Sequence, residues 1–326
     1  MKFLTVENLC IDFVSGREKL RAVSNVSFDV EQGSITALVG ESGCGKSASC
    51  LSITRLLPSP PAVLSADRVE FLTKSGKRQD LFQLSPRQLR KIRGSEIAYI
   101  FQEPGASLNP VMRIGDQIAE VLALCCPDVR DRKKRVIELL DNVGIPAPDQ
   151  RIYAFPHELS GGMQQRVMIA MALAGEPRLL IADEPTTALD VTIQAQILEL
   201  LDRLRKERDM AVILVTHNLG IVSQLADQVI VMYAGNIVET APASELFASP
   251  RHPYTRALLR AVPVPGADQK RLETIPGRVP AIADYPAGCR FCTRCPAAQE
   301  RCAKELPLLT ACGNGHYCRC FFAEES

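Results

Sequence analysis

A glycine-rich loop between an apolar run and a helix-forming segment constrains this chain more than any other feature. The loop spans Gly40 to Ser47 and reads G-x-x-x-x-G-K-S, the pattern of a phosphate-binding loop. The run from Ile35 to Val39 predicts a buried strand before the loop, and the stretch to about Leu57 predicts a helix after it. We therefore expect a strand–loop–helix unit, although an ordinary Gly/Ser turn could have the same letters.

This loop predicts a nucleoside triphosphate site. Its glycines let backbone N–H groups point inward, where they and the helix N-terminus can cradle phosphate oxygens. We expect Lys46 to reach the β- and γ-phosphates and the Ser47 hydroxyl to bind Mg²⁺. Oxidation of the Cys44 thiol could affect triphosphate binding, which the sequence leaves open. The predicted nucleotide-binding residues are Gly40, Glu41, Ser42, Gly43, Cys44, Gly45, Lys46, Ser47 and Ala48.

Two acids follow a second short apolar run, Leu179 to Ala182. In phosphate-loop ATPases a strand beside the loop presents an aspartate to Mg²⁺. Asp183 suits that role, through a water molecule, and Glu184 could then polarise the attacking water. Two solvated acids at the end of a strand are the alternative.

A second anion site is predicted before the apolar helix Val167 to Ala174. Ser160 can cap that helix, and Gly161 and Gly162 allow close backbone approach. Since one chain with one phosphate loop then has two anion sites, the second site could serve the nucleotide of another chain.

Strands alternate with helices along the chain, which predicts an α/β fold with a mixed, mainly parallel sheet. Residues 103–175 have helical periodicity and predict a helical subdomain. Proline becomes dense after residue 250, so we expect an ATPase domain over 1–250 and a small Cys-rich appendage over 251–326.

Charge and hydropathy exclude several classes of protein. The 326 residues carry a net charge of +1, which gives no basic field for nucleic acid. No apolar run approaches the roughly 18 residues of a membrane helix. Acids at Glu7 and Asp12 argue against a secretion signal, so we expect a cytoplasmic chain that docks on a membrane from outside the bilayer.

Twelve cysteines are many for the cytoplasm, where thiols stay reduced, and seven of them lie between Cys289 and Cys320. Cys289, Cys292 and Cys295 are separated by two residues each, with a proline after the third. That spacing is similar to ferredoxin ligation, with zinc held by thiolates as the rival and metal-free structural thiols as the remaining reading.

The motifs together resemble the nucleotide-binding subunits of ABC transporters. In order they are the phosphate loop, Gln102 after the strand Ile97 to Phe101, LSGGM at residues 159–163, LLIADE at 179–184, TALD at 187–190, and His217 after a strand. Met163 stands where many members have glutamine. The spelling LSGGMQQR is typical of the dipeptide/oligopeptide and nickel importer branch.

The resemblance implies a head-to-tail dimer in which the phosphate loop of one subunit and the LSGGM segment of the other enclose ATP. By role, Gln102 senses Mg²⁺ and the water, His217 contacts the γ-phosphate, and Asp190 lies at the dimer interface. Phe13 stands where the family places an aromatic ring under the adenine, although from spacing alone a core phenylalanine fits equally well. The implied catalytic residues are Glu184, His217 and Gln102, and the implied Mg²⁺ residues are Ser47, Gln102 and Asp183.

The same resemblance implies the partners and the location. They are a second ATPase subunit, more often a different chain than a copy, two membrane permease subunits and an extracytoplasmic solute-binding protein. The chain would sit peripherally on the cytoplasmic face of the inner membrane. The implied cargo is a di- or oligopeptide, with nickel, glutathione or another solute as alternatives. A non-transport ABC ATPase of DNA repair or translation is the remote alternative, since this chain has one cassette and no heptad insertion.

Many members of the branch end in a Pro-Tyr-Thr segment and a tail with a Gly-Cys pair, a Cys-Pro pair and further cysteines, and some hold a [4Fe–4S] cluster there. The matching positions here are Cys289, Cys295, Cys302 and Cys320. Zn²⁺ is the alternative, and Cys318 or Cys292 could replace Cys320 as the fourth ligand.

Overall fold

The chain divides into two compact units. The computed structural model describes residues 1–16, 18–187, 189–261 and 274–323. The first unit, here the helical unit, contains Met1, Glu31–Gly33 and Phe71–Leu214. The second, here the loop unit, contains Lys2–Val30, Ser34–Glu70 and Val215–Ser326, and so holds the phosphate loop.

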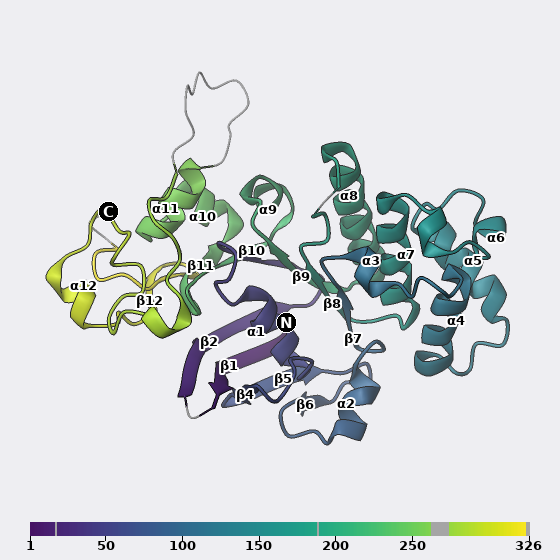
Figure 1. Cartoon of the computed structure of the whole chain (residues 1–326), viewed down its shortest axis with the longest axis horizontal. Coiled ribbons are helices and arrows are strands. Elements are labelled where there is room, and N and C mark those ends of the chain that lie inside the picture. The colour runs from purple at the N-terminus through teal and green to yellow at the C-terminus, as the bar shows by residue number, and fades with distance from the viewer. Residues whose placement is uncertain (17, 188, 262–273, 324–326) are drawn as a thin grey trace. The chain divides into compact units, whose positions relative to one another are not determined.

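Two long strands begin the loop unit and appear in purple in Figure 1. They are β1 (Lys2–Ser15) and β2 (Glu18–Glu31), and β1 also pairs in antiparallel fashion with β4 (Ala62–Ser65). The strands predicted over 3–14 and 22–30 are confirmed, although β1 is buried on both faces over residues 3–6 and 9–12 and so does not follow the one-sided pattern that alternation predicts. In this register Phe13 lies opposite Ala62.

A second group of strands leads into the phosphate loop. Strand β3 (Ile35–Val39) is buried at all five residues and pairs in parallel with β10 (Gln228–Tyr233). The group runs β12-β13-β11-β10-β3, with antiparallel pairing of β11 (Asn236–Pro242), β13 (His316–Cys318) and β12 (Thr310–Gly313). The apolar run of β3 is explained by burial on both faces of the sheet.

Helix α1 (Lys46–Ile53) starts directly after the phosphate loop. It ends four residues before the predicted Leu57, because Arg55 adopts a left-handed conformation with φ 52° that breaks the helix. The later helical segments of this unit are α9 (Leu219–Leu225), α10 (Ala243–Ala248), α11 (Pro253–Arg260), the 3-10 turn η2 (Ile282–Asp284) and α12 (Glu300–Lys304).

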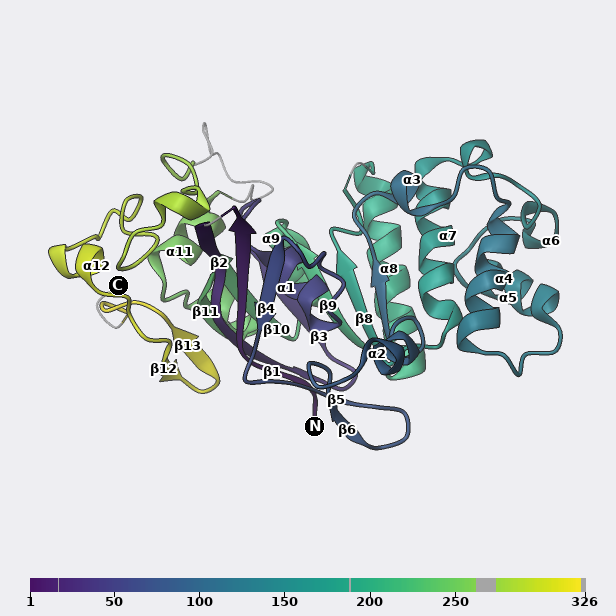
Figure 2. The same ribbon diagram turned by 60° about the horizontal axis from the view of Figure 1, so that its bottom comes forward.

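The helical unit contains three packed helices, shown side by side in Figure 2. They are α4 (Ile114–Cys125), α5 (Arg132–Asn142) and α7 (Gly161–Ala174). The helical periodicity predicted for residues 103–175 agrees with burial in α4, where Ile114, Ile118 and Leu122 are buried. Shorter segments between or before them are α2 (Pro86–Ile92), α3 (Pro104–Ser107), α6 (Pro148–Arg151) and the 3-10 turn η1 (Pro156–Glu158).

Strands in the helical unit carry the predicted acids. Strand β7 (Ile97–Ile100) pairs in parallel with β8 (Leu179–Asp183), with Ile97 opposite Leu179. Helix α8 (Val191–Arg208) follows β8. Strand β6 (Arg78–Asp80) also belongs to this unit, whereas β5 (Arg68–Leu72) and β9 (Ala211–Thr216) each have residues in both units.

The region after residue 250 shares its core with the strand that leads into the phosphate loop. Tyr254 of α11 and Phe291 belong to one buried cluster with Val39 of β3 and Tyr233 of β10. The domain boundary at residue 250 stays a prediction, and contacts place Val215–Ser326 in the loop unit. Within the described residues no helix is long and apolar enough to cross a membrane.

Candidate functional site

The phosphate loop is held tightly against β10. Gly40 has φ 150° and Gly45 has φ 103°, conformations that favour glycine. A Cβ on Gly40 would lie 2.2 Å from the carbonyl oxygen of Met232, so only glycine allows this approach. Glycine at positions 40 and 45 is thus required by backbone geometry.

The Lys46 side chain is buried within its own loop. Its Nζ donates hydrogen bonds to the carbonyl oxygens of Gly40 at 2.8 Å and Glu41 at 2.9 Å. Ser42, Gly43 and Ser47 are exposed beside it, at the N-terminal end of α1. The loop therefore presents one ammonium group, a hydroxyl and backbone N–H groups, which is the donor set that a triphosphate and its cation require.

Cys44 is buried inside the loop. Burial raises the pKa of its thiol, while the neighbouring Lys46 opposes that rise. A protonated, buried thiol reacts slowly with oxidants, because the thiolate is the nucleophile. The geometry therefore gives Cys44 a packing role.

Two residues from the C-terminal region contact the loop, and sequence reasoning assigned neither of them to the site. The Tyr254 hydroxyl accepts a hydrogen bond from the Glu41 backbone N–H at 2.9 Å. Arg294 forms two hydrogen bonds to the Glu41 carboxylate, at 2.7 and 3.0 Å. The Pro-Tyr-Thr segment drew attention to Tyr254 only as a family feature, and no local signal marks Arg294.

Gln102 and Glu184 are brought together in the helical unit. The Glu184 carboxylate accepts hydrogen bonds from Gln102 Nε2 at 3.2 Å and from Thr187 Oγ1 at 2.8 Å. Glu184 has φ 46°, a left-handed conformation that costs an L-residue roughly 1–2 kcal/mol. Such strain is tolerated where the surroundings fix the residue, and here Thr187 N–H also bonds to the Glu184 carbonyl.

Asp183 is the last residue of β8, and Glu184 follows it directly beyond the end of the strand. This is the arrangement expected for a cation-binding aspartate followed by a general base. Thr187, which sequence reasoning quoted only within the TALD motif, orients Glu184 through its hydroxyl.

The predicted second anion segment begins α7. Ser160 Oγ accepts the Met163 N–H at 3.4 Å and caps this helix, as predicted. A Cβ on Gly162 would lie 2.9 Å from Ile193 of α8, whose N-terminus is capped by Asp190. Ser160–Gly162 and Asp190 thus lie at the beginnings of two neighbouring helices, and Ser160, Gly161 and Asp190 are exposed.

The predicted residues fall into the two units separately. The phosphate loop, Phe13 and the exposed His217 belong to the loop unit, whereas Gln102, Asp183, Glu184, Ser160–Gly162 and Asp190 belong to the helical unit. Phe13 is partly buried in β1. Ala188 of the TALD motif lies outside the described residues.

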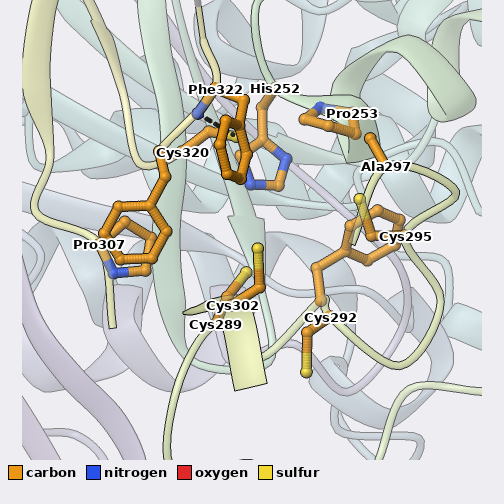
Figure 3. Close-up of a pocket in the computed structure, with 12 residues that line it drawn as sticks. His252, Pro253, Cys289, Cys292, Cys295, Ala297, Cys302, Pro307, Cys320 and Phe322 are labelled. Carbon is orange, nitrogen blue, oxygen red and sulfur yellow. Dashed lines mark hydrogen bonds between the residues drawn. The ribbon is translucent and has the colours of Figure 1, made fainter. Parts of the chain in front are cut away.

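Five cysteines line one cavity of about 30 Å³ in the loop unit (Figure 3). They are Cys289, Cys292, Cys295, Cys302 and Cys320. In Figure 3, Cys289 and Cys302 lie side by side, whereas the sulfur of Cys292 points away. The Cys289 N–H donates to the Cys302 carbonyl at 2.8 Å.

These thiols fit a metal in kind but do not converge on one. Among the described residues no group of three or more His, Cys, Asp or Glu side chains is placed to hold a metal ion. Burial raises the pKa of Cys289 to about 12 and also raises the pKa values of Cys295 and Cys320. Cys289, Cys295 and Cys320 are therefore protonated at neutral pH, and a metal would have to displace those protons.

A phosphate loop after a buried strand, two acids ending a second strand and a capped Ser-Gly-Gly helix start together define an ATP-binding cassette. The chain matches the ABC transporter family over residues 23–187 and the oligopeptide/dipeptide transporter C-terminal region over residues 238–302. This chain belongs to the ABC transporter family as one of its ATP-binding subunits. Such subunits are Mg²⁺-dependent ATPases coupled to transport, which dimerise and act with membrane permeases.

Relatives match along nearly the whole chain. It is 47% identical over 323 residues to the dipeptide transport ATP-binding protein DppD of Escherichia coli strain K12, which covers 99% of this chain and 97% of that protein. DppD of Shigella flexneri gives the same values. Among solved structures, the dimeric ATP-binding cassette MJ0796 bound to ADP and Pi matches with a TM-score of 0.62 and 27% identity, covering 74% of this chain and 98% of that one.

Proposed function

We propose that this chain powers the import of di- or oligopeptides by hydrolysing ATP at the membrane. The peptide cargo is proposed from the full-length similarity to dipeptide transport subunits, together with the match of residues 238–302 to the oligopeptide/dipeptide region. We place the chain peripherally on the cytoplasmic face of the inner membrane, beside two permease subunits, a second and different ATPase subunit, and an extracytoplasmic solute-binding protein.

In this proposal each residue has a role in phosphoryl transfer to water. The loop Gly40–Ala48 would hold the triphosphate, with Lys46 for its β- and γ-oxygens, and Ser47, Gln102 and Asp183 would hold Mg²⁺. Glu184 is the general base, held by Gln102 and Thr187. The transition state of this reaction is stabilised mainly by the positioning of the reacting groups and by neutralisation of its charge.

Residues at the edges of the site complete the assignment. Phe13 stacks on the adenine and His217 contacts the γ-phosphate. Ser160, Gly161 and Gly162 cover the nucleotide that is bound to the phosphate loop of the partner ATPase. Asp190 lies at the interface between the two ATPase subunits. Support comes from the exposure of Ser160, Gly161, Asp190 and His217, which leaves these groups accessible to another chain or to a ligand.

The Glu184→Gln variant tests the catalytic assignment. It keeps the shape of the side chain and its hydrogen bonds but removes the base, so ATP should still bind while hydrolysis by the purified transporter falls about 10²- to 10⁴-fold. Lys46→Ala should instead weaken ATP binding. Near wild-type turnover of Glu184→Gln would refute the role of Glu184.

Uptake measurements test the cargo. A strain lacking this chain should lose uptake of labelled dipeptides and regain it with the wild-type chain but not with Glu184→Gln. Unchanged dipeptide uptake with loss of nickel or glutathione uptake would exclude the peptide assignment while leaving the ATPase assignment intact.

We propose further that Cys289, Cys295, Cys302 and Cys320 bind a [4Fe–4S] cluster, with zinc as the alternative. Support comes from their spacing in the sequence and from their position on one cavity, whose thiols would have to turn toward the cluster and lose their protons. Anaerobically purified protein should show broad visible absorbance and equal amounts of iron and sulfide. A colourless protein with one zinc, or with no metal, would reject the cluster.

A further inference from the structure

The phosphate loop carries an acidic side chain where it should bind an anion. Glu41 directly follows the first glycine of the motif, and its side chain is 29% exposed. An unpaired carboxylate in such a loop would repel a triphosphate and weaken its binding. The structure must therefore direct this charge elsewhere.

Glu41 is fixed at three different groups. Its carboxylate accepts two hydrogen bonds from Arg294, its backbone N–H donates to Tyr254 Oη, and its carbonyl accepts from Lys46 Nζ. The last contact connects it directly to the lysine that we assign to the phosphates. Displacement of Glu41 would therefore displace Lys46.

Arg294 is itself fixed in place by contacts outside the loop. Its side chain is only 4% exposed, its Nε donates to the Pro276 carbonyl at 2.8 Å, and its guanidinium lies 5.7 Å from the centre of the Tyr233 ring. A bidentate guanidinium–carboxylate pair is directional and stronger than an ordinary surface ion pair. The loop is thus held by a rigid partner.

Tyr254 provides the second support from the same region. It is fully buried and packs edge-on to Tyr233, with ring centres 4.7 Å apart. Burial strongly raises its pKa, so its hydroxyl stays neutral and can accept the Glu41 N–H. Arg294 and Tyr254 both come from beyond residue 250, so this region reaches the nucleotide site.

We infer that Arg294 is a positioning residue of the ATP site, which holds Glu41 and neutralises its charge so that the phosphate loop can accept a triphosphate. This inference rests on the proposed nucleotide site at Gly40–Ala48. It gives the C-terminal region a role in ATP affinity that is independent of any metal bound by the cysteines.

The test compares variants of the full-length chain in the assembled transporter. Arg294→Gln frees the Glu41 carboxylate, so the KM for ATP should rise roughly tenfold while kcat changes less than about twofold. Arg294→Lys keeps the charge without the fork geometry and should give a smaller rise. The matched control is Lys304→Gln, which removes one cation from the exposed Lys304–Glu300 pair of the same region and should match the wild type.

The decisive arm is a second substitution on the loop. In the Arg294→Gln background, Glu41→Gln removes the uncompensated charge, so most of the ATP affinity should return. A merely structural role for Arg294 predicts no such rescue. Thermal unfolding of all variants shows whether any of them has a folding defect. If Arg294→Gln is unstable, the KM for ATP of Arg294→Lys still tests the inference.

Three results would overturn the inference. Arg294→Gln and Arg294→Lys could both match Lys304→Gln, or the double variant could bind ATP as weakly as Arg294→Gln alone. In both cases the proposed function stands, provided that Lys46→Ala still weakens ATP binding. If the wild-type chain bound no ATP, the nucleotide site itself would fail, and the inference with it.

Discussion

Phe291 links the C-terminal region to the sheet behind the phosphate loop, and its replacement by alanine should be costly. The side chain is 1% exposed. Its ring centre lies 5.1 Å from that of Tyr233 and 5.3 Å from that of Tyr254, and it also approaches His252 at 5.9 Å. The substitution would thus leave a hole among three rings.

The cost can be worked from these contacts. Truncation of a buried phenylalanine destabilises by about 3–5 kcal/mol, which includes the cavity left behind. Favourable ring pairs are worth about 0.5–1.5 kcal/mol each beyond burial, so a value near the upper end is expected, about 4 kcal/mol. With a shift of about 2 °C per kcal/mol for a large chain, Tm should fall by about 8 °C.

Thermal unfolding followed by circular dichroism is the assay. Phe291→Leu keeps most of the volume and should cost under about 2 kcal/mol. Leu308→Ala is the control, because Leu308 is 76% exposed in the same region and should change Tm little. A Tm for Phe291→Ala within about 2 °C of that of Leu308→Ala would refute the shared core.

Two further predictions concern the same unit. His252 is neutral in the folded chain, since burial lowers its pKa from 6.5 to about 3, and its Nδ1 accepts the Tyr254 N–H. Because the unfolded chain binds a proton below pH 6.5 and the folded chain does not, stability should fall as pH drops toward 3, by up to about 1.4 kcal/mol per pH unit from this residue. His252→Asn keeps a capping side chain without titrating, so urea unfolding at several pH values should show a shallower loss, and an unchanged slope would contradict the assignment. Gly235→Ala should destabilise by more than the roughly 1–2 kcal/mol of a left-handed alanine, because its Cβ would lie 1.8 Å from the Ala22 carbonyl. Gly76→Ala, with φ 76° and open space, isolates the backbone term, and equal losses for the two variants in urea unfolding would show that the Ala22 contact does not matter.

Local pattern predicted much of the secondary structure. The apolar runs Ile35–Val39 and Leu179–Ala182 predict strands, and Ser160 predicts a helix start; all three are confirmed because period, length and capping chemistry are local properties. The end of α1 at Ile53 was missed, since no sequence signal marked the left-handed Arg55.

The sequence by itself determined the phosphate loop, its lysine and the order of the family motifs, since these depend on neighbours in the chain and on glycine at positions where a side chain cannot fit. Only the tertiary structure decided that Arg294 and Tyr254 form hydrogen bonds with Glu41, and that Thr187 and Gln102 form hydrogen bonds with Glu184. Arg294 is 253 residues from its partner, and no local pattern encodes a contact made over that distance by packing. The physical reason is that a charge pair with one buried partner is specified by the core beside it, here Tyr233, Tyr254 and Phe291, and not by its own sequence neighbours.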